Sequence, residues 1–442
     1  MKKLICLALI LIMSVMLNGC MFVYEESTGM ETATSAQTEE TTTSPVSDID
    51  GYEYVEAITI ETENNEAVTL DAGYNTLTCD EERECYEQLH KYIYYISEEA
   101  ASGFYKTYAV VLEDMYLSEA QIRLVISAYF QDHPEAYWTD SRFEYSNATD
   151  NTIVQMYSYL SAEDINATNE KAESAAYEIL SGIDADADAF EKELYIHDSI
   201  ITRCEYVDDL DEVPQEYRTY TILGPLVDGE AVCEGYSRSM QLLLSSVGIE
   251  SYNVLGIGTD ELHMWNCVKL ADKWYFVDPT WDDDGVDGAS YDYFNITTDQ
   301  LLYDHTISPL YSSLSEDQIC GTDDNSPDSF NLFVPECTDE SQSFFAHNAV
   351  VLYGLNYSDT ESICEELRRA AQNKEHKIYL LVDESADYDY VVDNLFYSGD
   401  YIFFDCVDSV NDELDSVTID RDNVSLRKSE VVSLVTVYLE YI

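Results

Sequence analysis

Residues 229–236 read GEAVCEGY, and this stretch decides how the middle of the chain is interpreted. Apolar residues recur at helical spacing from Cys233 to Val247, and Gly248 is suited to end a helix there. The thiol is therefore predicted at a helix N-terminus, where unpaired N–H groups and the helix dipole favour the thiolate and can hold a developing oxyanion. Taken alone, Cys233 would still be read as a small buried core residue.

Two downstream stretches supply candidate partners for this thiol. Residues 263–266 read HMWN, and residues 274–281 read WYFVDPTW. Acyl transfer by a thiol needs a base that takes and returns the proton, and a carboxylate that fixes the tautomer of the base. His263 and Asp278 are the residue types that this chemistry requires, and both follow Cys233 along the chain.

The expected hairpin geometry can bring the imidazole and the carboxylate together. Residues 262–270 and 273–278 are predicted strands, joined by a turn at residues 271–272. With a two-residue turn, Asp278 lies diagonal to His263 on one face of the sheet. An odd-numbered turn would place Asp278 on the opposite face, so the inference depends on the length of the turn.

Together the three stretches resemble the transglutaminase-like superfamily, a branch of the papain-like cysteine enzymes whose catalytic residues follow in the order Cys, His, Asp. The resemblance covers about residues 190–300. It implies an α+β, papain-like core in which a nucleophile helix packs on an antiparallel sheet. It also implies that Cys233 is the nucleophile, His263 the base and acid, and Asp278 the orienting carboxylate.

Two positions depart from the family pattern. Ala271 and Asp272 replace the Asp-Gly turn of many members, so the turn lacks a residue that easily adopts left-handed backbone. Glu234 stands where bacterial relatives often carry a neutral polar residue. Its carboxylate would oppose thiolate formation at Cys233 unless it points to solvent, which leaves the degree of thiol activation open.

Three further residues are candidates for contact with substrate or for the wall of the site, namely Trp265, Asn266 and Trp281. An aromatic wall would exclude water from an acyl-enzyme. Packing in the core is the alternative for the tryptophans, and a hydrogen bond to the backbone is the alternative for the asparagine.

Neither acidic run of the chain predicts a metal site. Residues 184–188 read DADAD, but the glycine and the glutamate of an EF-hand loop are missing after them. Residues 282–288 read DDDGVDG and are interpreted as a solvated acidic turn. We therefore predict no metal and no cofactor.

The charge balance limits the partners. The chain has 21 Lys and Arg residues against 88 Asp and Glu residues, a net charge of −67. Such a chain repels phosphate backbones, so no nucleic-acid partner is expected. Its 442 residues, 46% of them apolar, are enough for more than one hydrophobic core.

The N-terminus has the pattern of an export signal. Two lysines precede an apolar run at residues 4–17, and residues 17–20 read LNGC, which resembles the lipobox of bacterial lipoproteins. Residues 1–20 are predicted to be a lipoprotein signal peptide, with lipidation of Cys20 placing the protein on the extracellular side of the cell membrane. An ordinary secretory signal with a chance cysteine is the alternative. Residues 21–51, rich in Thr, Ser and Glu, are predicted to be a disordered tether.

Three domains are expected after the tether. Residues 52–180 are predicted to form a mainly helical domain, and residues 181–312 the transglutaminase-like domain. Residues 340–442 alternate between extended and helical patterns and are predicted to form a small α/β domain, with one strand at residues 377–382 and another near Tyr401.

The sequence thus predicts an exported, lipid-anchored cysteine enzyme that acts on amide bonds of peptides or proteins outside the cell, through an acyl-enzyme on Cys233. If water accepts the acyl group the enzyme is a protease or amidase, and if a lysine amine accepts it the enzyme cross-links proteins. Hydrolysis is slightly favoured. The alternative is a catalytically silent surface protein that binds peptides or cell-wall glycans.

Overall fold

The structure is a computed structural model of the 442-residue chain. It describes residues 49–60, 67–100, 103–147, 151–210, 216–283, 288–398, 401–414 and 417–442, and the backbone of strand β1 (Tyr24–Glu26). The predicted signal peptide with Cys20 lies outside the described residues, as does the predicted tether apart from β1 and residues 49–51. Within these described ranges, no helix combines the length and apolar composition needed to cross a membrane.

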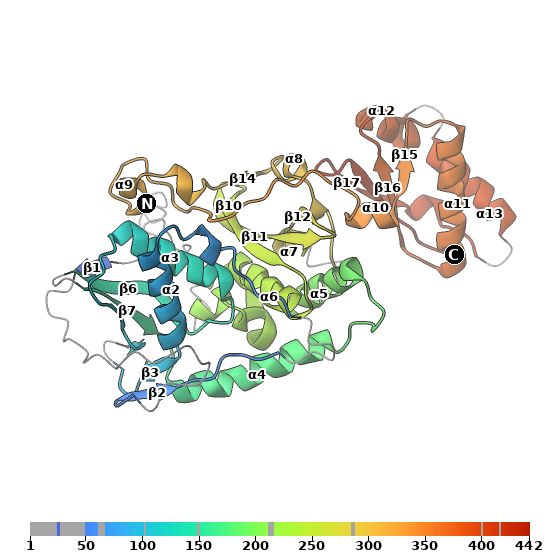
Figure 1. The fold of residues 1–442 in the computed structure, drawn as a ribbon. Helices are drawn as coiled ribbons and strands as arrows, with labels where there is room; N and C mark the ends of the chain where they lie inside the picture. Colours follow the sequence, from blue (N-terminus) through green and yellow to red (C-terminus); the bar gives the residue numbers. More distant parts are fainter. Residues whose placement is uncertain are drawn as a thin grey trace, which may run out of the picture. The chain divides into compact units, whose positions relative to one another are not determined.

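The described chain divides into two compact units (Figure 1). Unit 1 comprises the chain up to residue 289 together with residues 304–336, and unit 2 comprises residues 290–303 and 337–442. Both units combine helices with sheets, which confirms the expected α+β class. The domain boundaries inferred from the sequence stay predictions.

The N-terminal part of unit 1 is a sheet accompanied by helices. Its strands lie in the order β1-β6-β7-β4, and β5 also pairs with β7. Helices α2 and α3 pack against each other beside this sheet (Figure 1). The elements are β2 (Tyr52–Tyr54), η1 (Tyr74–Thr76), α2 (Asp80–Tyr92), β3 (Tyr95–Ser97), β4 (Tyr105–Lys106), β5 (Val110–Leu112), α3 (Glu119–Asp132), β6 (Thr139–Ser146), β7 (Thr152–Ser158) and α4 (Ala162–Leu180).

The rest of unit 1 packs one long helix on an antiparallel sheet. Helix α6 contacts strands β10 and β11, and the strands run in the order β12-β11-β10-β14. The helix packs through an apolar stripe whose members Tyr236, Met240 and Leu243 are fully buried. The elements are α5 (Ala189–Arg203), β8 (Glu205–Tyr206), η3 (Glu216–Tyr220), η4 (Gly224–Asp228), β9 (Glu230–Ala231), α6 (Cys233–Ser246), β10 (Ser251–Gly258), β11 (Glu261–Leu270), β12 (Lys273–Val277), α7 (Pro279–Asp282), β14 (His305–Ile307), η5 (Tyr311–Ser313) and α9 (Glu316–Ile319).

The hairpin of β11 and β12 has the register that the sequence predicts. Leu270 pairs with Lys273, so the turn holds two residues, Ala271 and Asp272. Their φ angles are 48° and 65°, the left-handed backbone that a type I′ turn requires. The missing glycine therefore leaves the register unchanged, at a cost of roughly 1–2 kcal/mol for Ala271 and less for Asp272, because aspartate tolerates left-handed backbone.

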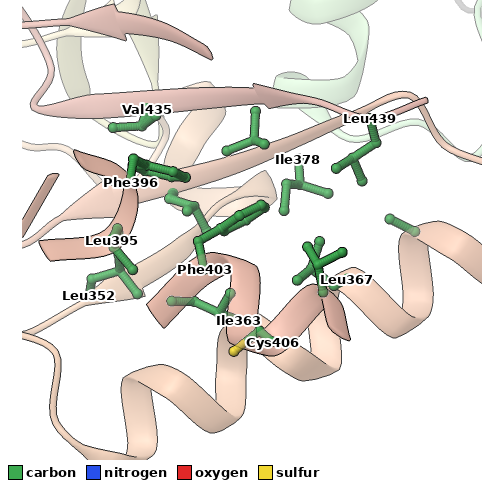
Figure 2. Packing of buried hydrophobic residues seen from close by; sticks show 14 of the residues in the cluster. Leu352, Ile363, Leu367, Ile378, Leu395, Phe396, Phe403, Cys406, Val435 and Leu439 are labelled. Carbon is green, nitrogen blue, oxygen red and sulfur yellow. The ribbon is translucent and has the colours of Figure 1, made fainter. Parts of the chain in front are cut away.

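Unit 2 is a small α/β fold whose sheet has the order β15-β16-β18-β17. Its core forms where helices α11 and α13 pack together beside this sheet (Figure 2). The elements are β13 (Phe294–Ile296), α8 (Thr298–Leu301), α10 (Phe344–Asn348), β15 (Val350–Leu352), α11 (Tyr357–Asn373), β16 (Lys377–Val382), α12 (Tyr388–Val392), η6 (Asp393–Tyr397), α13 (Ile402–Glu413), η7 (Arg421–Asn423), β17 (Ser425–Ser429) and β18 (Leu434–Tyr438).

One predicted strand of this unit is confirmed and another is wrong. Strand β16 has the predicted bounds, 377–382. The strand expected near Tyr401 is instead the start of helix α13. Residues 401–404, which read YIFF, favour a strand locally, but Phe403 and Val407 are four residues apart and both fully buried, so a helix places both side chains in the core.

Candidate active site

Cys233 is the first residue of helix α6. The π-helical turn η4 ends at Gly229, whose φ of 80° turns the chain toward the helix, and Val232 is extended just before the thiol. The N–H groups of the first helical turn have no acceptors within the helix, so they present positive partial charge around the sulfur. The side chain is buried, with 6% of the residue exposed.

His263 and Asp278 form a buried hydrogen-bonded pair. The distance from His263 Nε2 to Asp278 Oδ2 is 2.5 Å. The other carboxylate oxygen, Oδ1, accepts the backbone N–H groups of Thr280 at 3.0 Å and Trp281 at 3.1 Å. Asp278 is thus the N-cap of helix α7, and this cap fixes the carboxylate with one oxygen toward the imidazole.

The thiol and the imidazole are neighbours. Burial lowers the pKa of His263, but the charge and hydrogen bond of Asp278, together with a hydrogen bond to Cys233, raise that pKa to about 10. Burial alone would raise the pKa of Asp278, but the charges and hydrogen bonds of His263 and His305 bring that pKa well below its usual range. Because Nε2 of His263 faces Asp278, Nδ1 is the ring nitrogen available to the thiol. The structure therefore brings Cys233, His263 and Asp278 together as one chain of hydrogen-bonding groups.

Glu234 does not point to solvent, yet its charge is compensated. The side chain is buried beside Cys233, and its Oε1 accepts a hydrogen bond from Arg238 Nε at 2.8 Å. The two residues lie one helical turn apart on α6, an i,i+4 pair. The guanidinium offsets the negative charge that the sequence places next to the thiol.

The three candidate wall residues occupy different environments. Trp265 is fully buried, with its ring centroid 5.9 Å from that of His263, so it packs behind the imidazole. Trp281 is partly exposed, with its centroid 5.7 Å from His263. Asn266 is fully buried, and its Nδ2 donates to the backbone oxygen of Ser237 at 3.0 Å and to Asn253 Oδ1 at 3.1 Å. Of the three, Trp281 is the one placed to meet a substrate.

The sequence reasoning assigned no role to three further residues near the site. His305, at the start of β14, places its Nε2 at 3.3 Å from Asp278 Oδ2. Tyr206 and Tyr220 lie near the thiol: burial raises the pKa of both phenols, and the charge of Cys233 raises it further. The local sequence pattern around Cys233 carries little information about these neighbours, because each comes from a short element separate from helix α6.

His263, Asp278 and His305 also offer ligand atoms of the type that zinc binds, all within 4.8 Å of one another. All three side chains are buried, and their atoms are already hydrogen-bonded to one another through Asp278 Oδ2. We assign this cluster to the hydrogen-bond network around Asp278.

The arrangement suits nucleophilic acyl transfer. It supplies a thiol at a helix N-terminus, an imidazole in contact with the thiol, and an ionised carboxylate on the far side of the imidazole. These are the parts that cysteine and serine acyltransferases need for attack, proton transfer and orientation.

Known proteins resemble the chain over this region. Residues 173–279 match the family model of the transglutaminase-like superfamily. No curated protein matches the chain.

Solved structures resemble it at low identity. One, described as a TGase, is 14% identical with a TM-score of 0.23, covering 39% of this chain and 50% of the other. A candidate cysteine protease from Cytophaga hutchinsonii is 12% identical with a TM-score of 0.21, covering 29% and 52%. A candidate protease from Parabacteroides distasonis is 9% identical with a TM-score of 0.20, covering 31% and 35%. The chain thus spans only about a third to a half of the length of these structures.

The family match contains the thiol, the imidazole and the carboxylate whose geometry is described above. Over residues 173–279 the chain is thus similar to the transglutaminase-like superfamily.

Proposed function

We propose that the protein is a cysteine acyltransferase acting on amide bonds of peptides or proteins, exported and held at the cell surface by a lipid on Cys20. The observation that carries this proposal is the buried 2.5 Å pair of His263 and Asp278 beside a thiol at a helix N-terminus. The membrane anchor and the extracellular location are supported by the N-terminal sequence pattern.

The first half of the reaction forms a thioester. The Cys233 thiolate attacks the carbonyl carbon of a carboxamide or peptide, and the carbon–oxygen electron pair moves onto the oxygen. N–H groups at the start of α6 stabilise this oxyanion. As the carbon–nitrogen bond breaks, protonated His263 gives its proton to the nitrogen, and ammonia or an amine leaves. Asp278 keeps the imidazole ring oriented throughout.

The second half releases the acyl group. His263, now neutral, takes a proton from water or from an amine as that nucleophile attacks the thioester. Collapse of the second tetrahedral intermediate returns the electron pair to the Cys233 sulfur. Water yields a carboxylic acid, which makes the enzyme a protease or amidase, and a lysine amine yields a new amide, which makes it a cross-linker. Exclusion of water from the closed site decides between them.

The test is acyl transfer by the protein and by two cysteine variants. Casein is incubated with enzyme and a biotinylated primary amine, and in a parallel reaction without the amine ammonia and new N-termini are measured. Cys233→Ala should abolish every product, whereas Cys320→Ala, a half-buried cysteine elsewhere in unit 1, should leave them unchanged. Activity that survives in Cys233→Ala would remove the thioester mechanism. Saturable casein binding without product, unaffected by His263→Ala, would favour the silent binding protein instead.

A further inference from the structure

We infer that His305, backed by Asp304, is a positioning residue that shares the Asp278 carboxylate with His263 and so lets His263 release its proton to the leaving amine. This inference rests on the proposed function, since it concerns the same proton transfer. It starts from a residue that the acyl-transfer scheme leaves unused, a second imidazole on the carboxylate of the site.

Four donors surround the buried Asp278 carboxylate. Two backbone N–H groups of α7 bind Oδ1, and the Nε2 atoms of His263 and His305 both face Oδ2, at 2.5 Å and 3.3 Å. An ionised carboxylate only accepts hydrogen bonds, so each Nε2 that bonds to it carries a proton. Because the two imidazoles meet the same oxygen, each reduces the electron density available to the other.

The sheet is built to let these two rings converge. His305 pairs with Gly258 of β10, and His263 pairs with Gly256 of the same strand, so all four residues lie on one face. A Cβ on Gly258 would lie 2.9 Å from the Trp281 ring and 3.3 Å from the His263 ring. Because Gly256 and Gly258 of β10, the strand between β11 and β14, carry no side chains on this face, the two imidazole centroids can lie 5.6 Å apart.

His305 cannot itself reach a substrate. Its side chain is fully buried. Its ring centroid lies 4.2 Å from that of Trp281 and 5.1 Å from that of Trp265, so two indoles enclose it. A group without access to solvent or substrate acts through its neighbours, and the neighbour that joins the reaction is Asp278.

Asp304 sets the orientation of the His305 ring. Its Oδ1 lies 2.7 Å from His305 Nδ1, on the side of the ring away from Asp278. The two carboxylates hold the ring from both sides, which keeps Nε2 directed at Asp278. An outer hydrogen-bond partner of this kind fixes the direction in which an imidazole points.

The consequence concerns the strength of the His263–Asp278 bond. Without His305, Oδ2 would bind the N–H of His263 alone and hold its proton more tightly. Thiolate formation at Cys233 would persist, because the imidazolium is retained. Protonation of a leaving amine would become slower, since the acid gives up its proton less readily.

The test separates steps that need this proton from steps that do not. Alkylation of Cys233 by iodoacetamide and release of nitrophenolate from p-nitrophenyl acetate need no acid for the leaving group, whereas cleavage of glutamine amides in casein does. In His305→Phe we expect the ratio of amide to ester rates to fall about tenfold, the effect of one hydrogen bond to a charged group. His305→Gln, which keeps an N–H donor, should restore most of the ratio. The exposed His376 of unit 2 supplies the control variant His376→Phe.

A spectroscopic readout works without a substrate. At neutral pH the imidazole N–H proton of His263 should move downfield in His305→Phe, because its hydrogen bond shortens, and His305→Gln should reverse most of that shift. The resonance is assigned by its loss in His263→Gln, and thermal unfolding shows that each variant is folded.

The outcomes distinguish the two proposals. If amide and ester rates fall together and the N–H resonance does not move downfield, His305 is only a packing residue and the inference is wrong. If the wild-type protein cleaves no amide, the proposed function fails, and the N–H resonance alone then decides whether His305 shares the carboxylate.

Discussion

Replacing Asp278 with Asn removes the charge that keeps His263 protonated. The Asn side chain can still cap helix α7 through its oxygen, so the local backbone should be retained. Two effects then remain at His263: its burial, which lowers the pKa and is the larger, and its contact with Cys233, which raises the pKa. We therefore expect that pKa to fall from about 10 to near or below the ordinary 6.5. At pH 7.5 the imidazole changes from almost fully protonated to mostly neutral.

The same change has a calculable effect on stability. The difference between about 10 and 6.5 corresponds to up to about 5 kcal/mol, at about 1.4 kcal/mol for each pH unit. Because the pKa is raised in the folded protein, this stabilisation is fully present below pH 6.5 and is lost as the pH rises toward 10. The wild-type protein should lose that much more unfolding free energy than Asp278→Asn over this range.

Two measurements check the prediction. Proton NMR follows the titration of the seven histidines, with His263 assigned by its absence in His263→Gln. Urea unfolding at several pH values gives the free energies. Asp292→Asn is the matched control, because Asp292 is a buried carboxylate of unit 2 that pairs with Arg427. A midpoint for His263 in Asp278→Asn that stays within half a unit of the wild-type value would refute the reasoning.

Three further perturbations test other parts of unit 1. The Nε2 atom of the fully buried His197 lies 3.2 Å from the equally buried Asp282 of α7; burial lowers the pKa of His197, but hydrogen bonds to acidic neighbours raise that pKa to about 9. His197→Phe should lower the free energy of unfolding in urea by about 3–5 kcal/mol, because the buried Asp282 carboxylate loses its cation. A loss below 1 kcal/mol would contradict this. Glu234→Gln should speed the alkylation of Cys233 by up to about fivefold, because the positive charge of Arg238 is then no longer offset by Glu234 and stabilises the thiolate. A slower rate would show that the ion pair of Glu234 and Arg238 has another role. The double substitution Ala271→Asn and Asp272→Gly should raise the unfolding free energy by about 1–2 kcal/mol, because both positions have left-handed backbone. An unchanged urea midpoint would show that the turn is not strained.

The hairpin shows why some tertiary contacts can be predicted. Leu270 and Lys273 pair because only two residues separate the strands, and the alternation of side chains then decides which residues share a face. The same counting places Asp278, one residue beyond β12, within reach of His263. Both inferences depend only on the number of residues between the partners.

Other features depended on contacts that local pattern does not encode. Residues 401–404 favour a strand by composition, yet helix α13 forms because it packs on α11 in the core of unit 2 (Figure 2). The sequence alone could not show that the negative charge of Glu234 is offset. That outcome depends on the burial of this side of α6, where Arg238 rather than water contacts the carboxylate. In both cases the environment of the side chain decided the outcome.

The sequence by itself predicted that Cys233 begins a helix and, for a two-residue turn, that His263 and Asp278 meet, because helical period, strand alternation and turn length are short-range properties of the chain. Only the tertiary structure decided that His305 shares the Asp278 oxygen. That contact requires a strand formed after residue 304 to pair with β10, and the pairing of strands distant in sequence depends on how the whole sheet assembles.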